Sequence, residues 1–116
     1  MKTYAELLAE TKGRVREIGV REAMELQRRG DAVFVDVREP QEYNLGRIPG
    51  AQTISRGNLE KNIESAVPRA RLVVVYCANG NRSAFAADVL GGMGYADVRS
   101  LREGFSGWVA EGGDVE

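Results

Sequence analysis

The sequence predicts an α/β domain with a mainly parallel sheet of about five strands. Segments typical of strands alternate with segments of helical periodicity, and this alternating order is characteristic of a parallel sheet. The strand segments at residues 32–37 and 72–76 are apolar almost throughout, as expected of strands covered on both faces. The length of 116 residues fits one domain with a single core.

Apolar periodicity and the positions of Gly and Pro divide the chain into short elements. Residues 20–29 carry one apolar stripe with helical spacing and stop at Gly30, which is typical of a helix end. Pro68 ends a later helix, and Gly91 with Gly92 is expected to close the helix that follows Cys77. In chain order we expect helix 3–11, strand 16–18, helix 20–29, strand 32–37, helix 39–44, strand 52–54, helix 59–66, strand 72–76, helix 83–90, strand 98–101 and helix 105–110.

Composition excludes several functional classes. Lys and Arg total 16 against 17 Asp and Glu, so no excess of positive charge favours nucleic acid or a membrane surface as a partner. The single Cys cannot form an internal disulfide, and the absence of His excludes a Cys/His zinc site, a Ser-His-Asp triad and a Cys-His pair. We therefore expect neither a metal nor a cofactor. The N-terminal apolar run is too short for a signal peptide, which predicts a cytoplasmic location with a reduced thiol.

The one cysteine, Cys77, follows the most apolar strand and opens a turn rich in Gly and Asn. Ligands of parallel sheets bind at the carboxyl ends of strands, which is where this turn lies. Gly80 lets the backbone curl so that amide groups face inward, and the start of a helix and Arg82 add positive charge. These features favour a thiolate at Cys77. The alternative is a small buried apolar residue that merely ends a strand.

Four segments in order along the chain resemble the rhodanese homology domain family, and together they cover about residues 16–112. They are Asp36-Val-Arg38-Glu39 with Glu42-Tyr43, Gly46-Arg-Ile-Pro-Gly-Ala51, Cys77-Ala-Asn-Gly-Asn-Arg82-Ser83, and Gly104-Phe105-Ser-Gly-Trp108. The resemblance implies a three-layer α/β/α domain spanning residues 1–116, with residues 1–15 as a helical extension. It also implies the activity of a single-domain thiosulfate sulfurtransferase.

The resemblance implies a mechanism as well. The Cys77 thiolate attacks the outer sulfur of thiosulfate, releases sulfite and carries a persulfide, which a thiol or cyanide then accepts. A persulfide could replace thiosulfate as the sulfur donor, and the thiol of a sulfur-accepting protein could act as the acceptor. The residues expected to bind the donor are those of the loop after the cysteine: Ala78, Asn79, Gly80, Asn81, Arg82 and Ser83.

Two other functions remain as alternatives. A phosphatase or arsenate reductase of the same fold has five residues between Cys and Arg, whereas this chain has only the four residues 78–81. The shorter loop forms a smaller cradle, which suits one sulfur atom and is tight for a tetrahedral phosphate. The second alternative is a non-enzymatic module that carries or senses a persulfide. Within the sulfurtransferases, Arg82 favours an anionic donor.

Residues outside the loop have mostly structural interpretations. Asp36 and Arg38 either lie near the Cys77 loop, with Asp36 orienting it, or, as we favour, form a structural ion pair or cap the helix near Pro40. Arg47 replaces the usual His of its motif and is a weaker candidate for adding positive potential to the site. Arg38 and Glu42 are spaced i,i+4 and are expected to pair, and Ser83 is expected to cap the helix after the loop. Glu103 would be strained if its φ were positive. Phe105 and Trp108 are expected to pack in the core.

Overall fold

One parallel sheet runs through the molecule, in the strand order β1-β5-β4-β2-β3. The structure is a computed structural model that describes all 116 residues. The central strand, β4, pairs with β5 on one side and with β2 on the other. The sheet is parallel throughout, where the sequence predicted a mainly parallel one. The strands are β1 (Arg16–Ile18), β2 (Val33–Asp36), β3 (Gln52–Thr53), β4 (Leu72–Tyr76) and β5 (Asp97–Leu101).

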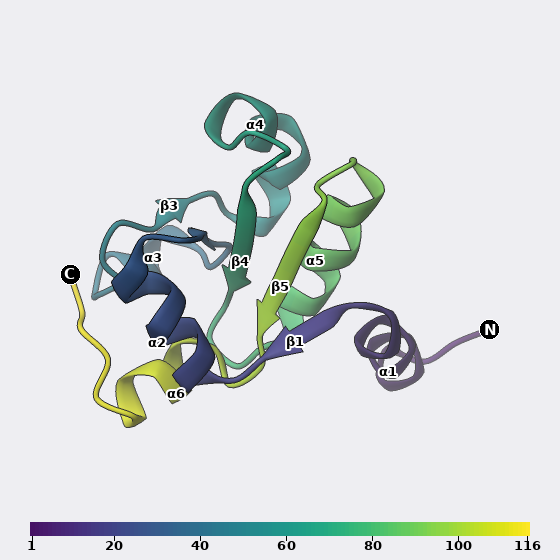
Figure 1. The fold of residues 1–116 in the computed structure, drawn as a ribbon. Helices are drawn as coiled ribbons and strands as arrows, with labels where there is room; N and C mark the ends of the chain where they lie inside the picture. Colours follow the sequence, from purple (N-terminus) through teal and green to yellow (C-terminus); the bar gives the residue numbers. More distant parts are fainter.

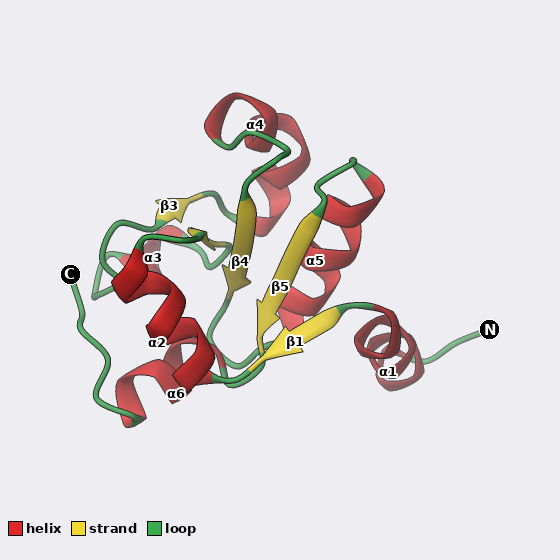
Figure 2. Ribbon diagram, in the orientation of Figure 1, coloured by secondary structure: helices red, strands yellow, loops and turns green.

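Helices cover both faces of this sheet, so the expected three-layer α/β/α architecture is confirmed (Figure 1). Helices α4 and α5 lie on one face, and α2 and α6 lie on the other. Figure 2 shows how regularly strands and helices alternate along the chain. No helix is long and apolar enough to cross a lipid bilayer. The helices are α1 (Tyr4–Arg14), α2 (Val20–Arg29), α3 (Pro40–Tyr43), α4 (Leu59–Ala66), α5 (Asn81–Gly92) and α6 (Gly104–Ala110), with a 3₁₀ turn η1 (Arg56–Asn58).

The apolar strands are explained by two cores, one on each face of the sheet. Because side chains alternate along a strand, Val73 and Val75 of β4 pack under α4 and α5, while Val74 and Tyr76 pack toward α2 and α6. All four of these side chains are fully buried. Cys77 continues the first set and belongs to the core under α4 and α5. Its position in the core therefore follows from the register of β4.

Helix α5 differs from its expected bounds at both ends. It begins at Asn81, two residues before the expected start, because Gly80 has a left-handed φ of 94° that turns the chain directly into the helix. It also continues through Gly91 and Gly92, which take helical conformations. The left-handed residue that follows is Gly94, with a φ of 93°. By contrast, α2, α4 and β4 have the bounds that the sequence predicted.

Helix α1 packs on the outside of α5. Arg14 makes two hydrogen bonds to the carboxylate of Asp88, at 3.0 and 2.9 Å, and the rings of Tyr4 and Phe85 lie 6.2 Å apart. A capping box between Thr3 and Glu6 stabilises its first turn. This helix contributes only one fully buried residue, so it is a peripheral addition to the sheet and its covering helices.

Candidate active site

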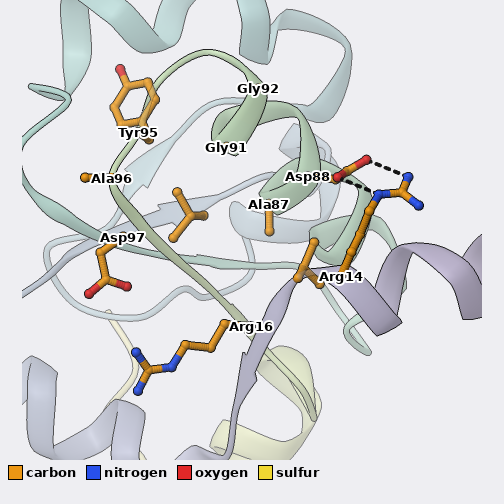
Figure 3. Close-up of a pocket in the computed structure, with 11 residues that line it drawn as sticks. Arg14, Arg16, Ala87, Asp88, Gly91, Gly92, Tyr95, Ala96 and Asp97 are labelled. Atoms are coloured by element: carbon orange, nitrogen blue, oxygen red, sulfur yellow. Dashed lines mark hydrogen bonds and ion pairs between the residues drawn. The ribbon is translucent and has the colours of Figure 1, made fainter.

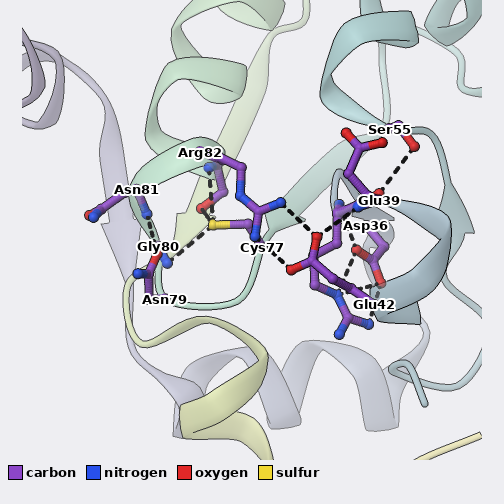
Figure 4. A network of polar contacts seen from close by, with 11 residues as sticks. Asp36, Glu39, Glu42, Ser55, Cys77, Asn79, Gly80, Asn81 and Arg82 are labelled. Atoms are coloured by element: carbon purple, nitrogen blue, oxygen red, sulfur yellow. Dashed lines mark hydrogen bonds and ion pairs between the residues drawn. The ribbon is translucent and has the colours of Figure 1, made fainter. Parts of the chain in front are cut away.

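The Cys77 sulfur lies in a turn that joins the carboxyl end of β4 to the amino end of α5. Two backbone amides donate hydrogen bonds to it, from Gly80 at 3.2 Å and from Ser83 at 3.3 Å (Figure 4). The amide of Ser83 belongs to the first turn of α5, whose free N–H groups and dipole favour a negative charge. The residue is fully buried. The turn therefore directs two backbone N–H donors at one sulfur atom.

The conformation of the turn depends on the residue types at positions 79 and 80. At Gly80 any β-carbon would collide with the backbone carbonyl of Arg102. The left-handed φ would also strain any other residue type at this position. Asn79 accepts a hydrogen bond from the amide of Asn81 at 3.2 Å, which tightens the turn just before the helix. These contacts explain why Gly and Asn occur here.

Ser83 does not cap α5, so that expectation is wrong. The N-cap position belongs to Gly80, and Ser83 lies within the first helical turn, fully buried. The Cys77 thiol donates to its hydroxyl oxygen at 3.5 Å, and the hydroxyl of Ser100 on β5 lies 2.8 Å from it. Ser100 is also fully buried and was missed in the sequence. Only the pairing of β4 with β5 brings it to the sulfur.

The first residues of helix α6 are hydrogen-bonded to the loop that contains Cys77. Its first amides donate to the turn's carbonyls, Phe105 to Cys77 at 2.8 Å and Ser106 to Ala78 at 3.1 Å. Gly104 has a φ of 65°, and a β-carbon there would lie 2.5 Å from the carbonyl carbon of Ala78. The strain considered for Glu103 is absent, because its φ is −87° and the left-handed conformation falls on Gly104. The C-terminal motif thus positions the cysteine loop.

The guanidinium of Arg82 is paired with a carboxylate, so its charge is not free to attract a ligand. Its guanidinium makes two hydrogen bonds of 2.8 Å to the carboxylate of Glu42 on α3, extending beside Cys77 to reach it (Figure 4). This contact lowers the pKa of Glu42 to about 2 and raises the pKa of Arg82 above its usual value. The expected pair of Arg38 with Glu42 is therefore wrong, since Glu42 bonds to Arg82 and Arg38 bonds to Asp36.

Asp36 and Arg38 form the structural ion pair that the sequence favoured. Both are buried, and the guanidinium of Arg38 donates to Asp36 at 2.7 Å and to the carbonyl of Gly46 at 2.7 Å. It also lies 4.2 Å from the ring centre of Phe105, a favourable cation–π distance. The side chain of Arg47 points to Glu116, with 3.5 Å between the guanidinium Nε and the carboxylate Oε1. The hydrogen bonds and ion pairs of these three side chains thus do not involve the Cys77 loop.

The largest cavity lies elsewhere. It has a volume of about 650 Å³ and is lined by residues of α1 and α5 and the starts of β1 and β5, including Arg14 and Asp97 (Figure 3). That position is the amino end of the strands, opposite to the end that carries Cys77.

No group of three or more Cys, Asp or Glu side chains is arranged to hold a metal ion.

The family model of the rhodanese-like domain matches residues 20–111, which is most of the chain. The chain belongs to the rhodanese-like domain family. This rhodanese-like domain is 40% identical over 95 residues to a protein of Ectopseudomonas mendocina named thiosulfate sulfurtransferase GlpE, covering 82% of the chain and 85% of that relative. A relative of the same name from Pseudomonas fluorescens is 42% identical over 87 residues, covering 75% and 78% respectively.

Solved structures agree with this assignment. A protein of unknown function from Rhodopseudomonas palustris, described as a possible tyrosine phosphatase, has a TM-score of 0.90 and 33% identity to this rhodanese-like domain, covering all of the chain and 96% of its own. A rhodanese-related protein from Thermoplasma volcanium has a TM-score of 0.79 and 30% identity, covering 87% and 97%.

Proposed function

We propose that this protein is a thiosulfate sulfurtransferase that carries the transferred sulfur on Cys77. The observation that supports this most directly is the sulfur itself, with two backbone amides directed at it from 3.2 and 3.3 Å at the start of α5. Relatives about 40% identical over most of the chain carry the same activity in their names. The absence of His from the chain is compatible with this chemistry, because a thiolate nucleophile needs no general base.

In the first half-reaction the thiolate attacks the outer sulfur of thiosulfate. A new S–S bond forms to Cys77, the bond between the two thiosulfate sulfurs breaks, and sulfite leaves with the electron pair. The product is a persulfide anion on the cysteine. The amides of Gly80 and Ser83 stabilise negative charge at this place, in the manner of an oxyanion hole.

In the second half-reaction a thiolate or cyanide attacks the outer sulfur of the persulfide. That sulfur moves to the acceptor, and the bonding pair returns to Cys77 as thiolate. The donor is thiosulfate or a persulfide, and the acceptor is a small thiol, cyanide or the thiol of a sulfur-accepting protein. The reaction needs no metal or cofactor, and it is compatible with the cytoplasmic location expected from the sequence.

Mass spectrometry after exposure to thiosulfate tests this function. The peptide that contains Cys77 should gain the mass of one sulfur atom and lose it again when cyanide is added. The variant Cys77→Ser is the control, because its hydroxyl cannot form a persulfide and the change in volume is small. Sulfur transfer by Cys77→Ser at a rate near that of the wild type would contradict the proposal, since no second cysteine is present.

The phosphatase alternative has one observation in its favour, the description of the Rhodopseudomonas palustris structure. The four-residue spacing between Cys77 and Arg82 opposes it, and so does the engagement of Arg82 by Glu42. Turnover of p-nitrophenyl phosphate would support a phosphatase. Uptake of sulfur without release to any acceptor would instead support a persulfide-sensing module.

A further inference from the structure

Glu42 places a fixed negative charge beside the sulfur loop. Its carboxylate is held from two sides, by both terminal nitrogens of Arg82 at 2.8 Å and by the backbone amide of Glu39 at 2.9 Å. The pKa of about 2 keeps Glu42 ionised at neutral pH. Because Arg82 is also charged, the two side chains persist as a neutral pair that links α3 to α5.

This pairing changes what Arg82 offers to a ligand at Cys77. The Arg82 guanidinium lies within electrostatic range of the Cys77 sulfur. A guanidinium has five N–H donors, and the contact with the carboxylate uses two of them. The other donors remain for hydrogen bonds to a sulfur donor. The long-range attraction of Arg82 for negative charge, however, is largely offset by Glu42.

We propose that Glu42 is a specificity-determining residue, which holds Arg82 beside Cys77 and offsets its charge so that the site accepts donors of different charge. This inference rests on the proposed sulfur-transfer function and concerns the choice of donor. With a free Arg82, the site would strongly favour the thiosulfate dianion. With Glu42 in place, it also accepts persulfides of small thiols, whose S–S group carries at most one negative charge.

Coulomb's law sets the expected size of the effect. Removing one negative charge several ångströms from a bound monoanion, in largely aqueous surroundings, strengthens its binding roughly threefold. For a dianion the interaction energy doubles, so the factor is squared to roughly ninefold. A neutral molecule is unaffected. At about 1 M salt the screening length is only about 3 Å, and the effect should disappear.

Two alkylating reagents measure this charge at Cys77 without any sulfur transfer. Iodoacetate and iodoacetamide react with the same sulfur, but only the first carries a negative charge. The ratio of their rate constants therefore separates charge from accessibility, and the single cysteine makes the signal unambiguous. In Glu42→Gln, which keeps an oxygen able to accept from Arg82, the ratio should rise roughly threefold at low salt.

Glu39→Gln is the matched control. It removes a charge of the same sign from the start of the same short helix, but its carboxylate makes no hydrogen bond to Arg82. The alkylation ratio in this variant should change by less than about 1.5-fold, because the guanidinium beside Cys77 stays paired with Glu42. An equal rise in both variants, or no rise in Glu42→Gln, would overturn the proposal.

Steady-state kinetics test the consequence for donors. In Glu42→Gln the KM for thiosulfate should fall roughly ninefold at low salt with little change in kcat, while the KM for glutathione persulfide should fall by threefold or less. A higher thiosulfate KM with an unchanged alkylation ratio would mean that Glu42 only orders Arg82, and the proposal would be wrong. If the wild type takes no sulfur from thiosulfate, the proposed function fails, whereas the alkylation ratio still decides the role of Glu42.

Discussion

The hydroxyls of Ser83 and Ser100 form a buried chain that ends at the Cys77 sulfur. The two oxygens lie 2.8 Å apart, and Ser83 lies 3.5 Å from the sulfur. Once the thiol has lost its proton, Ser83 can donate to the sulfur while Ser100 donates to Ser83. In that arrangement the Ser100 hydroxyl orients the Ser83 hydroxyl toward the sulfur, and the substitutions below test this role.

This chain predicts graded effects of two substitutions. Ser83→Ala removes a hydrogen bond to a charged atom, worth about 1.5 kcal/mol, and should slow sulfur uptake from thiosulfate about tenfold. Ser100→Ala removes only the orienting partner and should slow uptake about threefold. Stopped-flow or quenched mass spectrometry measures both rates. Ser106→Ala, at an exposed position on α6, is the control and should leave the rate unchanged.

The Glu42–Arg82 pair predicts a pH dependence of stability. The pKa of Glu42 is lowered from 4.5 to about 2 in the folded protein, so the unfolded chain binds its proton more readily. The stabilisation is therefore complete above about pH 4.5 and is lost as the pH falls toward about 2. Urea unfolding should show that Glu42→Gln is less stable than the wild type at neutral pH and that the difference shrinks in acid. A difference independent of pH would contradict this ionic origin.

At the scale of elements, Gly80 and Gly104 have left-handed φ values and join the cysteine loop to the starts of α5 and α6. Gly104→Ala would force a β-carbon to within 2.5 Å of Ala78 and would strain a backbone with a φ of 65°. We expect a loss of at least about 2 kcal/mol in unfolding free energy and slower sulfur uptake, because the loop must move. Urea unfolding and the thiosulfate reaction measure the two effects.

The control for this substitution is Gly91→Ala. Gly91 lies in α5 with no atom near the position of a β-carbon, and its φ is not left-handed. Alanine favours the helix there and should stabilise the protein by up to about 1 kcal/mol. Similar losses in both variants would mean that the close approach of Gly104 to the loop is unimportant.

The sequence predicted the elements well where local signals decide them. Helices α2 and α4 and strand β4 follow directly from apolar periodicity and from Gly30 and Pro68. The ends of α5 were misplaced because a sequence does not reveal which of several glycines takes the left-handed conformation. Gly80 and Gly94 do so, while Gly91 and Gly92 are helical.

The site was predictable only in part, for a related reason. Cys77 and its loop are contiguous in the sequence, so their chemistry could be inferred from residue types. Glu42 and Ser100 reach the loop through tertiary structure, from 40 residues before Arg82 and 17 residues after Ser83. Side chains brought together over such separations leave no local pattern, and a helical i,i+4 spacing even suggested the wrong partner for Glu42.

At the scale of the whole molecule, residues 112–116 run from the end of α6 to the loop that precedes β3 (Figure 1). The indole nitrogen of Trp108 donates to the carbonyl of Asp114 at 2.7 Å. Arg47 and Glu116 exchange two backbone hydrogen bonds, at 3.3 and 2.9 Å. Since Arg38 bonds to the neighbouring carbonyl of Gly46, this segment also stabilises the surroundings of the buried Asp36–Arg38 pair.

Trp108→Phe tests whether the indole anchors this segment. The change removes the hydrogen bond to Asp114 and part of a buried ring that packs edge-on against Phe34. We expect a loss of about 2–4 kcal/mol in unfolding free energy and faster hydrogen exchange at the Glu116 amide. Val109→Ala, at an exposed position on the same helix, should change stability by less than about 0.5 kcal/mol. If exchange at Glu116 keeps its wild-type rate while global stability falls, the segment is held by its pairing with Arg47, and Trp108 contributes to the core alone.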